Sequence, residues 1–281
     1  MGDLPVASIV CAFGAALLFA IAAVAQQTAA ANVREDQSLV RELARSPRWW
    51  AGLVGDGGGY VLQAVALALG SVLVVQPILV TALVFALPLS ARFSHRAVGA
   101  RNWSLAAALC VALAVFLVIG NPTEGDGGAP FSDWALPLAI LLAIVTAAAL
   151  LASRRIDPGR RALLLGTAGG LLFGLAAALT QYVTGLLGHG LAHLLTSWQT
   201  WALVASGAVG LYLQQRAYQV GPLTASLPAV TVGEPIAAAY IGMTVLDERL
   251  RAVGGGLLVT IAAVVVMCVT AVALSRSEAV G

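Results

Sequence analysis

Two carboxylic acids are the residues best placed for chemistry in this sequence. Asp56 and Glu234 are the acids that fall inside long apolar segments and away from the segment ends. A charged side chain in the hydrocarbon core of a bilayer is costly, and such a residue is a functional-site candidate by default. Glu234 lies near the middle of its segment and predicts a proton-coupling or cation-binding carboxylate. The alternative is a neutral acid that donates a hydrogen bond to a carbonyl freed by Pro228 or Pro235.

Asp56 stands in a run of glycines that weakens a helix. Gly57, Gly58 and Gly59 follow it directly, and we expect them, with Pro77, Pro228 and Pro235, to act as helix breaks or hinges. Three interpretations of Asp56 stay open at this point. It forms a structural pair with Arg216, it contacts a substrate or ion, or it is a solvated acid beside packing glycines.

Several amides and phenols also fall within the apolar segments. An amide in hydrocarbon needs hydrogen-bond partners, so these side chains either bond between helices or line a polar cavity. The candidates for substrate or ion binding are Gln63, Gln76, Gln181, Gln214, Tyr60 and Tyr240.

No phosphate-binding GxxxxGK[ST] motif, HExxH or CxxC occurs, so we expect no ATP-driven domain, no enzyme activity and no cofactor. Which groups would hold a metal ion stays unknown.

The composition requires a lipid surrounding for these residues. The chain is 60% hydrophobic and only 10% charged, and its mean hydropathy is +0.92. Backbone groups in hydrocarbon must be paired within each span, which favours helices. Apolar runs of about 20 residues mark such spans. We therefore predict an all-α integral membrane protein with nine transmembrane helices, at 5–31, 49–69, 71–91, 103–120, 133–153, 162–185, 199–219, 223–246 and 252–275.

The basic residues orient the nine predicted spans. All fifteen are arginines, which suggests a GC-rich bacterial genome. Arginine is enriched on the cytoplasmic side, and two of the fifteen, Arg249 and Arg251, fall on the side opposite the rest. The N-terminus is therefore predicted outside and the C-terminus inside a bacterial cytoplasmic membrane. The thirteen others are Arg34, Arg41, Arg45, Arg48, Arg92, Arg96, Arg101, Arg154, Arg155, Arg160, Arg161, Arg216 and Arg276.

Two stretches of the chain are copies of one another. Trp50–Gly70 and Trp201–Gly221 align without a gap and share seven identical residues, among them Gln63 and Gln214. With the predicted orientation, the first copy crosses the membrane from the cytoplasmic side to the outside, and the second copy crosses it in the opposite direction. Such an inverted repeat is typical of transporters with a site between the halves. We expect a first repeat of four spans at 1–125 and a second of five spans at 126–281.

The second half carries a motif of a known family. It reads Val-Gly-Glu234-Pro235, followed thirteen residues later by Glu248-Arg249, and it comes after Ala-Tyr-Gln-Val-Gly221-Pro. The sequence resembles the EamA-like drug/metabolite transporter superfamily, and Gln76-Pro77 is the counterpart of Glu234-Pro235 if seven residues are inserted after Gly70. Without a gap, Pro77 pairs with Pro228 instead. Ser90-Ala-Arg92 departs from the Gly-Glu-Arg that is usual in the family.

The resemblance implies a secondary transporter that moves a small solute by alternating access, with ion or proton coupling. The four-plus-five arrangement is similar to the NIPA-like branch, some members of which are linked to magnesium transport. A magnesium carrier is therefore one alternative, and Asp56 and Glu234 would then face a common path. A lipid-linked sugar flippase or a membrane scaffold subunit is another. The expected partners are membrane lipid and a small-molecule or cation substrate, without nucleic acid, and a homodimer stays open.

Overall fold

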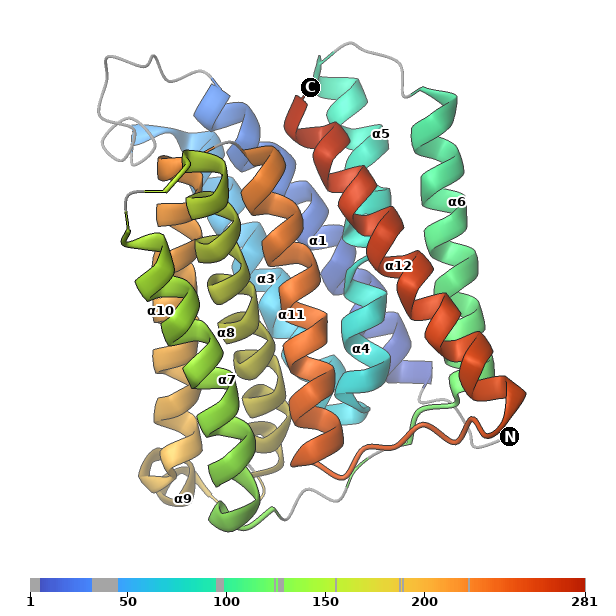
Figure 1. Ribbon diagram of the computed structural model, residues 1–281, viewed down its shortest axis with the longest axis vertical. Coiled ribbons are helices and arrows are strands. Elements are labelled where there is room, and N and C mark those ends of the chain that lie inside the picture. The colour runs from blue at the N-terminus through green and yellow to red at the C-terminus, as the bar shows by residue number, and fades with distance from the viewer. Residues whose placement is uncertain are drawn as a thin grey trace.

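The computed structural model is all-α in the part of the chain that it describes, which is residues 6–31, 45–94, 99–123, 125, 129–154, 156–186, 188, 190–221 and 223–280. Its helices stand side by side and most run the full height of the molecule (Figure 1). They are α1 (Val6–Ala31), α3 (Pro47–Leu69), α4 (Val72–Leu79), α5 (Ala82–Ser94), α6 (Ala100–Val115), the π-helix η1 (Phe116–Gly120), α7 (Phe131–Ala152), α8 (Pro158–Leu186), α9 (Leu191–Thr196), α10 (Trp198–Val220), α11 (Leu223–Thr244) and α12 (Gly255–Val280).

Helices occupy each of the nine ranges predicted as spans. Six of them are long and apolar enough to cross a membrane: α1, α3, α6 with η1, α7, α8 and α12. A shorter apolar helical stretch covers 72–86. These features are those of a multi-pass, all-α membrane protein. The count of nine spans and their sidedness remain predictions.

The helices of the two sequence copies have matching bounds. α10 covers 198–220 and α3 covers 47–69, and α11 and α4 begin at 223 and 72. Each pair of bounds differs by the same 151 residues. Gly70 and Gly221 end their helices in nearly the same extended conformation, with φ of −166° and −164°. The register without a gap, in which Pro77 pairs with Pro228, therefore fits the helix starts.

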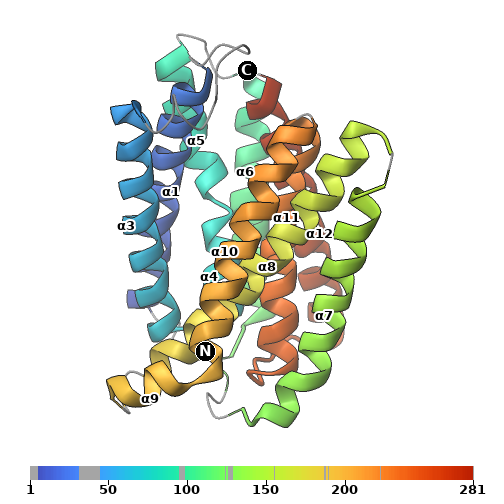
Figure 2. The same cartoon turned by 90° about the vertical axis from the view of Figure 1, so that its left-hand side faces the viewer.

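The two copies run in opposite directions along the molecule. In Figures 1 and 2, α3 descends from the upper end, where α12 finishes, and α10 ascends to that end. α1 packs along α3, and α8 packs along α10. The helix ends that carry Arg48, Arg101, Arg160 and Arg216 lie at the upper end, whereas Arg249 and Arg251 lie in the lower connection between α11 and α12. Arg34, Arg41, Arg96 and Arg155 fall outside the described residues.

Helix α8 is the central packing element, because small residues let two neighbours approach it. Added side-chain atoms at Gly166 and Gly170 would meet the Ser226 carbonyl oxygen at 2.8 Å and the Val230 carbonyl oxygen at 2.6 Å, both on α11. Gly174 stands in the same way against the Glu234 carbonyl. Glycines spaced by four residues form one stripe on a helix, and such stripes allow close packing between membrane helices. The glycines at 166, 170 and 174 therefore let α8 and α11 pack closely.

Gly170→Ala should therefore lower the free energy of unfolding by about 1–3 kcal/mol, the usual cost of overpacking a tight contact. Gly207→Ala is the matched control, since Gly207 is also helical but has nothing within 4 Å of the added methyl. Thermal unfolding of both variants in detergent micelles measures the difference. Equal melting temperatures would contradict the close α8–α11 contact.

Candidate functional site

The predicted span at 71–91 consists of two helices joined by one tight turn. Helix α4 ends at Leu79, and α5 begins at Ala82. The amide of Thr81 donates to the Ile78 carbonyl at 2.9 Å, and its hydroxyl donates to the same oxygen at 2.6 Å. Pro77 stands one turn before this junction and lacks an amide hydrogen, so the regular hydrogen bonding has already failed there. Val80 keeps helical dihedral angles, with φ of −60° and ψ of −22°, so the junction is one tightened turn and not an unwound segment.

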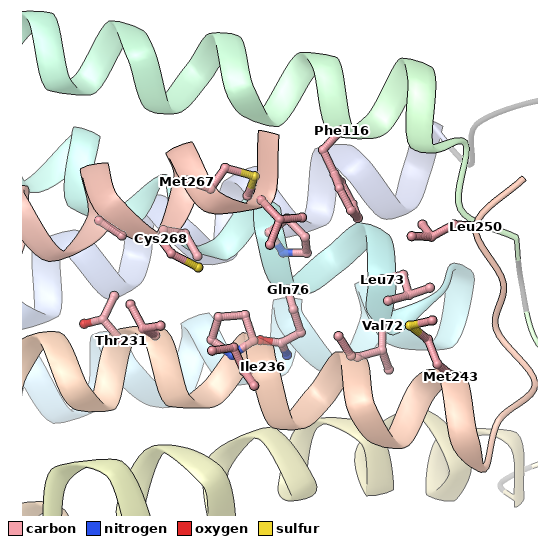
Figure 3. A pocket seen from close by; sticks show the side chains of 17 residues that line it. Val72, Leu73, Gln76, Phe116, Thr231, Ile236, Met243, Leu250, Met267 and Cys268 are labelled. Atoms are coloured by element: carbon pink, nitrogen blue, oxygen red, sulfur yellow. The ribbon is translucent and has the colours of Figure 1, made fainter. Parts of the chain in front are cut away.

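A cavity of about 290 Å³ lies between α4, η1, α11 and α12. Figure 3 shows Gln76 of α4 at its back wall, Thr231 and Ile236 of α11 along one side, and Met267 of α12 along the other. Phe116, the first residue of η1, closes a further part of the wall. Seventeen residues line the cavity, and none of these described side chains carries a charge. Its volume lies near the lower end of the range for ligand pockets.

The polar groups of the cavity are few and come from two proline-containing helices. Gln76 is 2% exposed, and its Nε2 atom has no hydrogen-bond partner in the described part of the chain. Pro77 and Pro235 also line the cavity. A proline ring within a helix faces the carbonyl four residues earlier and leaves it without its usual donor. For Pro77 that carbonyl belongs to Leu73, which is itself a lining residue, and Gln76 adds one side-chain amide to the same wall.

Glu234 does not line this cavity. It is half-buried on α11 beside Pro235, turned away from the cavity by one helical position, about 100°. Its backbone packs on Gly174 of α8. The structure records no hydrogen bond or ion pair to its carboxyl group from the residues it describes. The acid is therefore next to the cavity wall and remains available for a proton or cation.

Among the residues that the structure describes, Glu248 is the charged residue that is buried, with 1% of its surface exposed. Its two carboxylate oxygens accept hydrogen bonds from the amides of Val72 and Leu73, at 2.7 and 2.9 Å. These amides are the first of α4 and have no acceptor inside that helix. A carboxylate at a helix N-terminus also interacts favourably with the helix dipole. Gly242 leaves room for it, since an added side-chain atom there would meet Oε2 at 2.8 Å.

The loop that holds Glu248 is fixed at the lower end of the molecule. The Thr123 amide donates to the Arg249 carbonyl at 2.8 Å, and the Arg249 amide donates to the Thr123 hydroxyl at 3.1 Å. Arg249 pairs with Asp247 at 2.8 Å, both exposed. The adjacent acidic and basic residues thus act separately here: Glu248 caps α4, and Arg249 pairs with Asp247.

The other predicted site residues are dispersed rather than gathered. The Tyr60 hydroxyl is 2.8 Å from the Thr180 hydroxyl and links α3 to α8. Gln181 donates to the Gly70 carbonyl at 3.5 Å. Gln63 is buried on α3, and Gln214 and Tyr240 are half-buried on α10 and α11. Of the predicted amides and phenols, the structure brings Gln76 to the cavity.

Asp56 is half-buried on α3, which packs mainly on α1 and α8. Its predicted pair with Arg216 stays a prediction. Among the described residues, no three His, Cys, Asp or Glu side chains cluster in a way that could hold a metal ion. Asp56 and Glu234 stand on α3 and α11, which both pack on α8, and neither acid lines the cavity.

The structure shows no helix break at the three glycines or at Pro228 and Pro235, and a hinge role for them stays a prediction. α3 runs unbroken through Gly57, Gly58 and Gly59, and α11 runs unbroken through Pro228 and Pro235. Gly59 and Gly58 instead serve close packing on α1, because added atoms would meet Phe19 at 2.7 Å and Leu18 at 3.3 Å. Neighbouring helices stabilise a proline-containing helix by packing, which the sequence alone does not reveal.

Comparison with known proteins identifies one relative along nearly the whole chain. It is the uncharacterized protein Cgl0250/cg0304 of Corynebacterium glutamicum, 35% identical over 272 residues, which cover 95% of this chain and 94% of the relative. The chain belongs to the same protein family as this relative. No protein-family model and no solved structure matches the chain.

The relative's name states no activity, so the chemistry of this family follows from the residues of the site. The site combines an uncharged cavity, two prolines in its wall, a carboxylic acid beside the wall and a buried carboxylate that caps α4. A cavity with an apolar wall and one polar amide can accept a small ligand. The sequence analysis named Glu248 only as part of a motif. Its contact with the amides of residues 72 and 73 could not be predicted, because no local sequence pattern indicates it.

Proposed function

We propose that this chain is a secondary transporter of the drug/metabolite type, which moves a small solute across the bacterial cytoplasmic membrane by alternating access. The observation that carries the proposal is the cavity, in whose wall Gln76 and Pro77 of α4 meet Pro235 of α11. A binding site where the two halves of an inverted repeat meet is a recurring feature of secondary transporters.

The internal duplication supports the same proposal. The two copies have matching helix bounds and run in opposite directions (Figure 2). Opposed copies allow one packing arrangement to exist in two mirrored forms, open to one side or the other. The helices on each side of the cavity, α4 and α11, each follow directly after one of the two copies.

Glu248 and Glu234 have separate roles in this proposal. Glu248 holds the α11–α12 loop on α4 and so closes the lower end, which the arginine distribution predicts to be outside. Opening at this end requires that the carboxylate leave the two amides. Glu234 is the coupling carboxylate, because it lies beside the cavity wall on the helix that must move with it.

A small organic solute fits the site better than a divalent cation. Mg²⁺ is held by oxygen ligands, usually carboxylates, and keeps part of its water shell. The described cavity lining has no carboxylate, and apolar side chains make up most of it. An apolar wall instead binds the body of an organic molecule.

Transport by the purified protein in vesicles tests the proposal. Metabolites and Mg²⁺ are first screened for thermal stabilisation of the protein, and each stabilising compound is then followed into vesicles under an imposed pH gradient. We expect an organic solute to be taken up in a saturable manner. Uptake no faster than in protein-free vesicles, for every stabilising compound, would contradict transport.

A further inference from the structure

The cavity has a mouth on the side of the helical bundle. Three of its lining residues are largely exposed: Ile236 at 52%, Met243 at 50% and Val264 at 39%. They belong to α11 and α12, which stand next to each other in Figure 1. The opposite wall, formed by Val72, Leu73 and Gln76 of α4, is buried. The cavity therefore deepens from an exposed edge between α11 and α12 toward α4.

In a membrane this edge faces hydrocarbon and not water. Ile236 and Met243 belong to the predicted span at 223–246, and Val264 belongs to an apolar helix long enough to cross a bilayer. All three side chains at the mouth are apolar. A strongly water-soluble ligand would gain nothing along this route, whereas a molecule dissolved in the bilayer reaches the mouth directly.

The shape and chemistry of the cavity select among such molecules. Thr231 and Met243 line its length on α11 and are twelve residues apart, about 18 Å at 1.5 Å per residue. The lining is uncharged, and a charged ligand buried there would lack a counter-charge. At the buried wall, Gln76 Nε2 is a donor without an acceptor in the described chain. A buried donor left without a partner is costly, so a ligand that supplies an oxygen atom is favoured.

We propose that the cavity binds a lipid-soluble molecule that consists of one extended apolar chain and an uncharged oxygen acceptor, such as an ester or hydroxyl. It enters sideways between α11 and α12 and places its oxygen at Gln76. Only one part of this inference rests on the proposed function, namely that the bound ligand is also the solute that is transported. Binding is a separate property and is tested separately.

The probe is methyl dodecanoate with a photoreactive diazirine in its chain, added to the full-length protein in phospholipid nanodiscs. After irradiation, mass spectrometry locates the adducts. We expect them to concentrate on the α4, α11 and α12 residues of the cavity, above the level on Leu136 and Leu150, which are exposed apolar residues of α7. Adducts spread evenly over all exposed apolar residues would overturn the proposal.

Two variants and two further probes sharpen the result. Gln76→Leu should lower the cavity adducts about fivefold, the effect of losing one net hydrogen bond, and Ile236→Trp should lower them by filling the exposed mouth. Gln199→Leu is the matched control, since Gln199 is also a buried amide but does not line the cavity. Equal labelling by the matching hydrocarbon would overturn the role of the oxygen. Equal labelling by a phospholipid that bears the diazirine in its acyl chain would assign the cavity to ordinary bilayer lipid.

The outcomes also separate this inference from the proposed function. Cavity adducts that depend on Gln76, without transport of any compound, would leave the binding site standing and contradict the transporter. Saturable uptake of a water-soluble solute, without cavity adducts, would support the transporter and contradict the lipid-soluble ligand.

Discussion

Glu248→Ala should lower the free energy of unfolding by about 3 kcal/mol or more, because two hydrogen bonds to a charged group are lost and each contributes about 1.5–3 kcal/mol. The variant leaves the amides of Val72 and Leu73 without their acceptor at a buried helix start. It also removes a link between segments 176 residues apart in the chain. Thermal or denaturant unfolding in micelles measures the loss.

Two control variants assign the effect of Glu248→Ala to the capping carboxylate. Glu248→Gln keeps one oxygen acceptor and should lose about half as much stability as Glu248→Ala. Asp247→Ala removes the neighbouring exposed acid, whose ion pair with Arg249 contributes at most about 1 kcal/mol. If Glu248→Ala and Asp247→Ala proved equally stable, the cap on α4 would have no energetic role.

Glu234→Gln should abolish the dependence of solute uptake on a pH gradient. The amide has nearly the same shape as the acid but cannot release a proton at neutral pH. Without a titratable group the gradient no longer drives the cycle, so we expect the ratio of uptake with the gradient to uptake without it to fall to about 1. Uptake of a stabilising compound into vesicles, with and without the gradient, gives the measurement.

Glu234→Asp is the control for this prediction, since it retains a titratable carboxyl group one methylene shorter. It should keep the response to the gradient at a reduced rate. Binding of the solute should survive in both variants, because Glu234 does not line the described cavity. An unchanged rate and an unchanged response in Glu234→Gln would mean that this acid is structural.

The positions of the helices could be predicted from the sequence because hydrophobic runs determine them locally. The helix bounds agree with the nine predicted ranges to within a few residues. The duplicated segments Trp50–Gly70 and Trp201–Gly221 form most of α3 and α10, two helices of equal length. Gly170 could also be assigned to close packing, since small residues at helical spacing indicate that role without any knowledge of the partner.

The site could be predicted only in part, because its contacts join distant segments. Gln76 was a candidate and does line the cavity, but nothing in the sequence indicated that Gln63, Gln181 and Tyr60 would bond or pack elsewhere. The turn between α4 and α5 lies at Val80–Thr81, one helical turn after Pro77. The two hydrogen bonds from Thr81 to the Ile78 carbonyl determine its position, and the proline alone does not. The cap by Glu248 depends on how α11 meets α4, which no local pattern describes.

The central claim is that the two tryptophan-led copies cross the membrane in opposite senses around one cavity. Single cysteines at Arg48, before the first copy, and at Thr196, before the second, test it directly in a chain whose Cys11, Cys110 and Cys268 have been replaced by alanine. Both positions are exposed at helix ends. We predict that a membrane-impermeant maleimide added outside intact cells labels Thr196→Cys alone, and that Arg48→Cys is labelled only after the membrane is opened. Labelling of both cysteines from the same side would contradict the inverted repeat and, with it, the transporter.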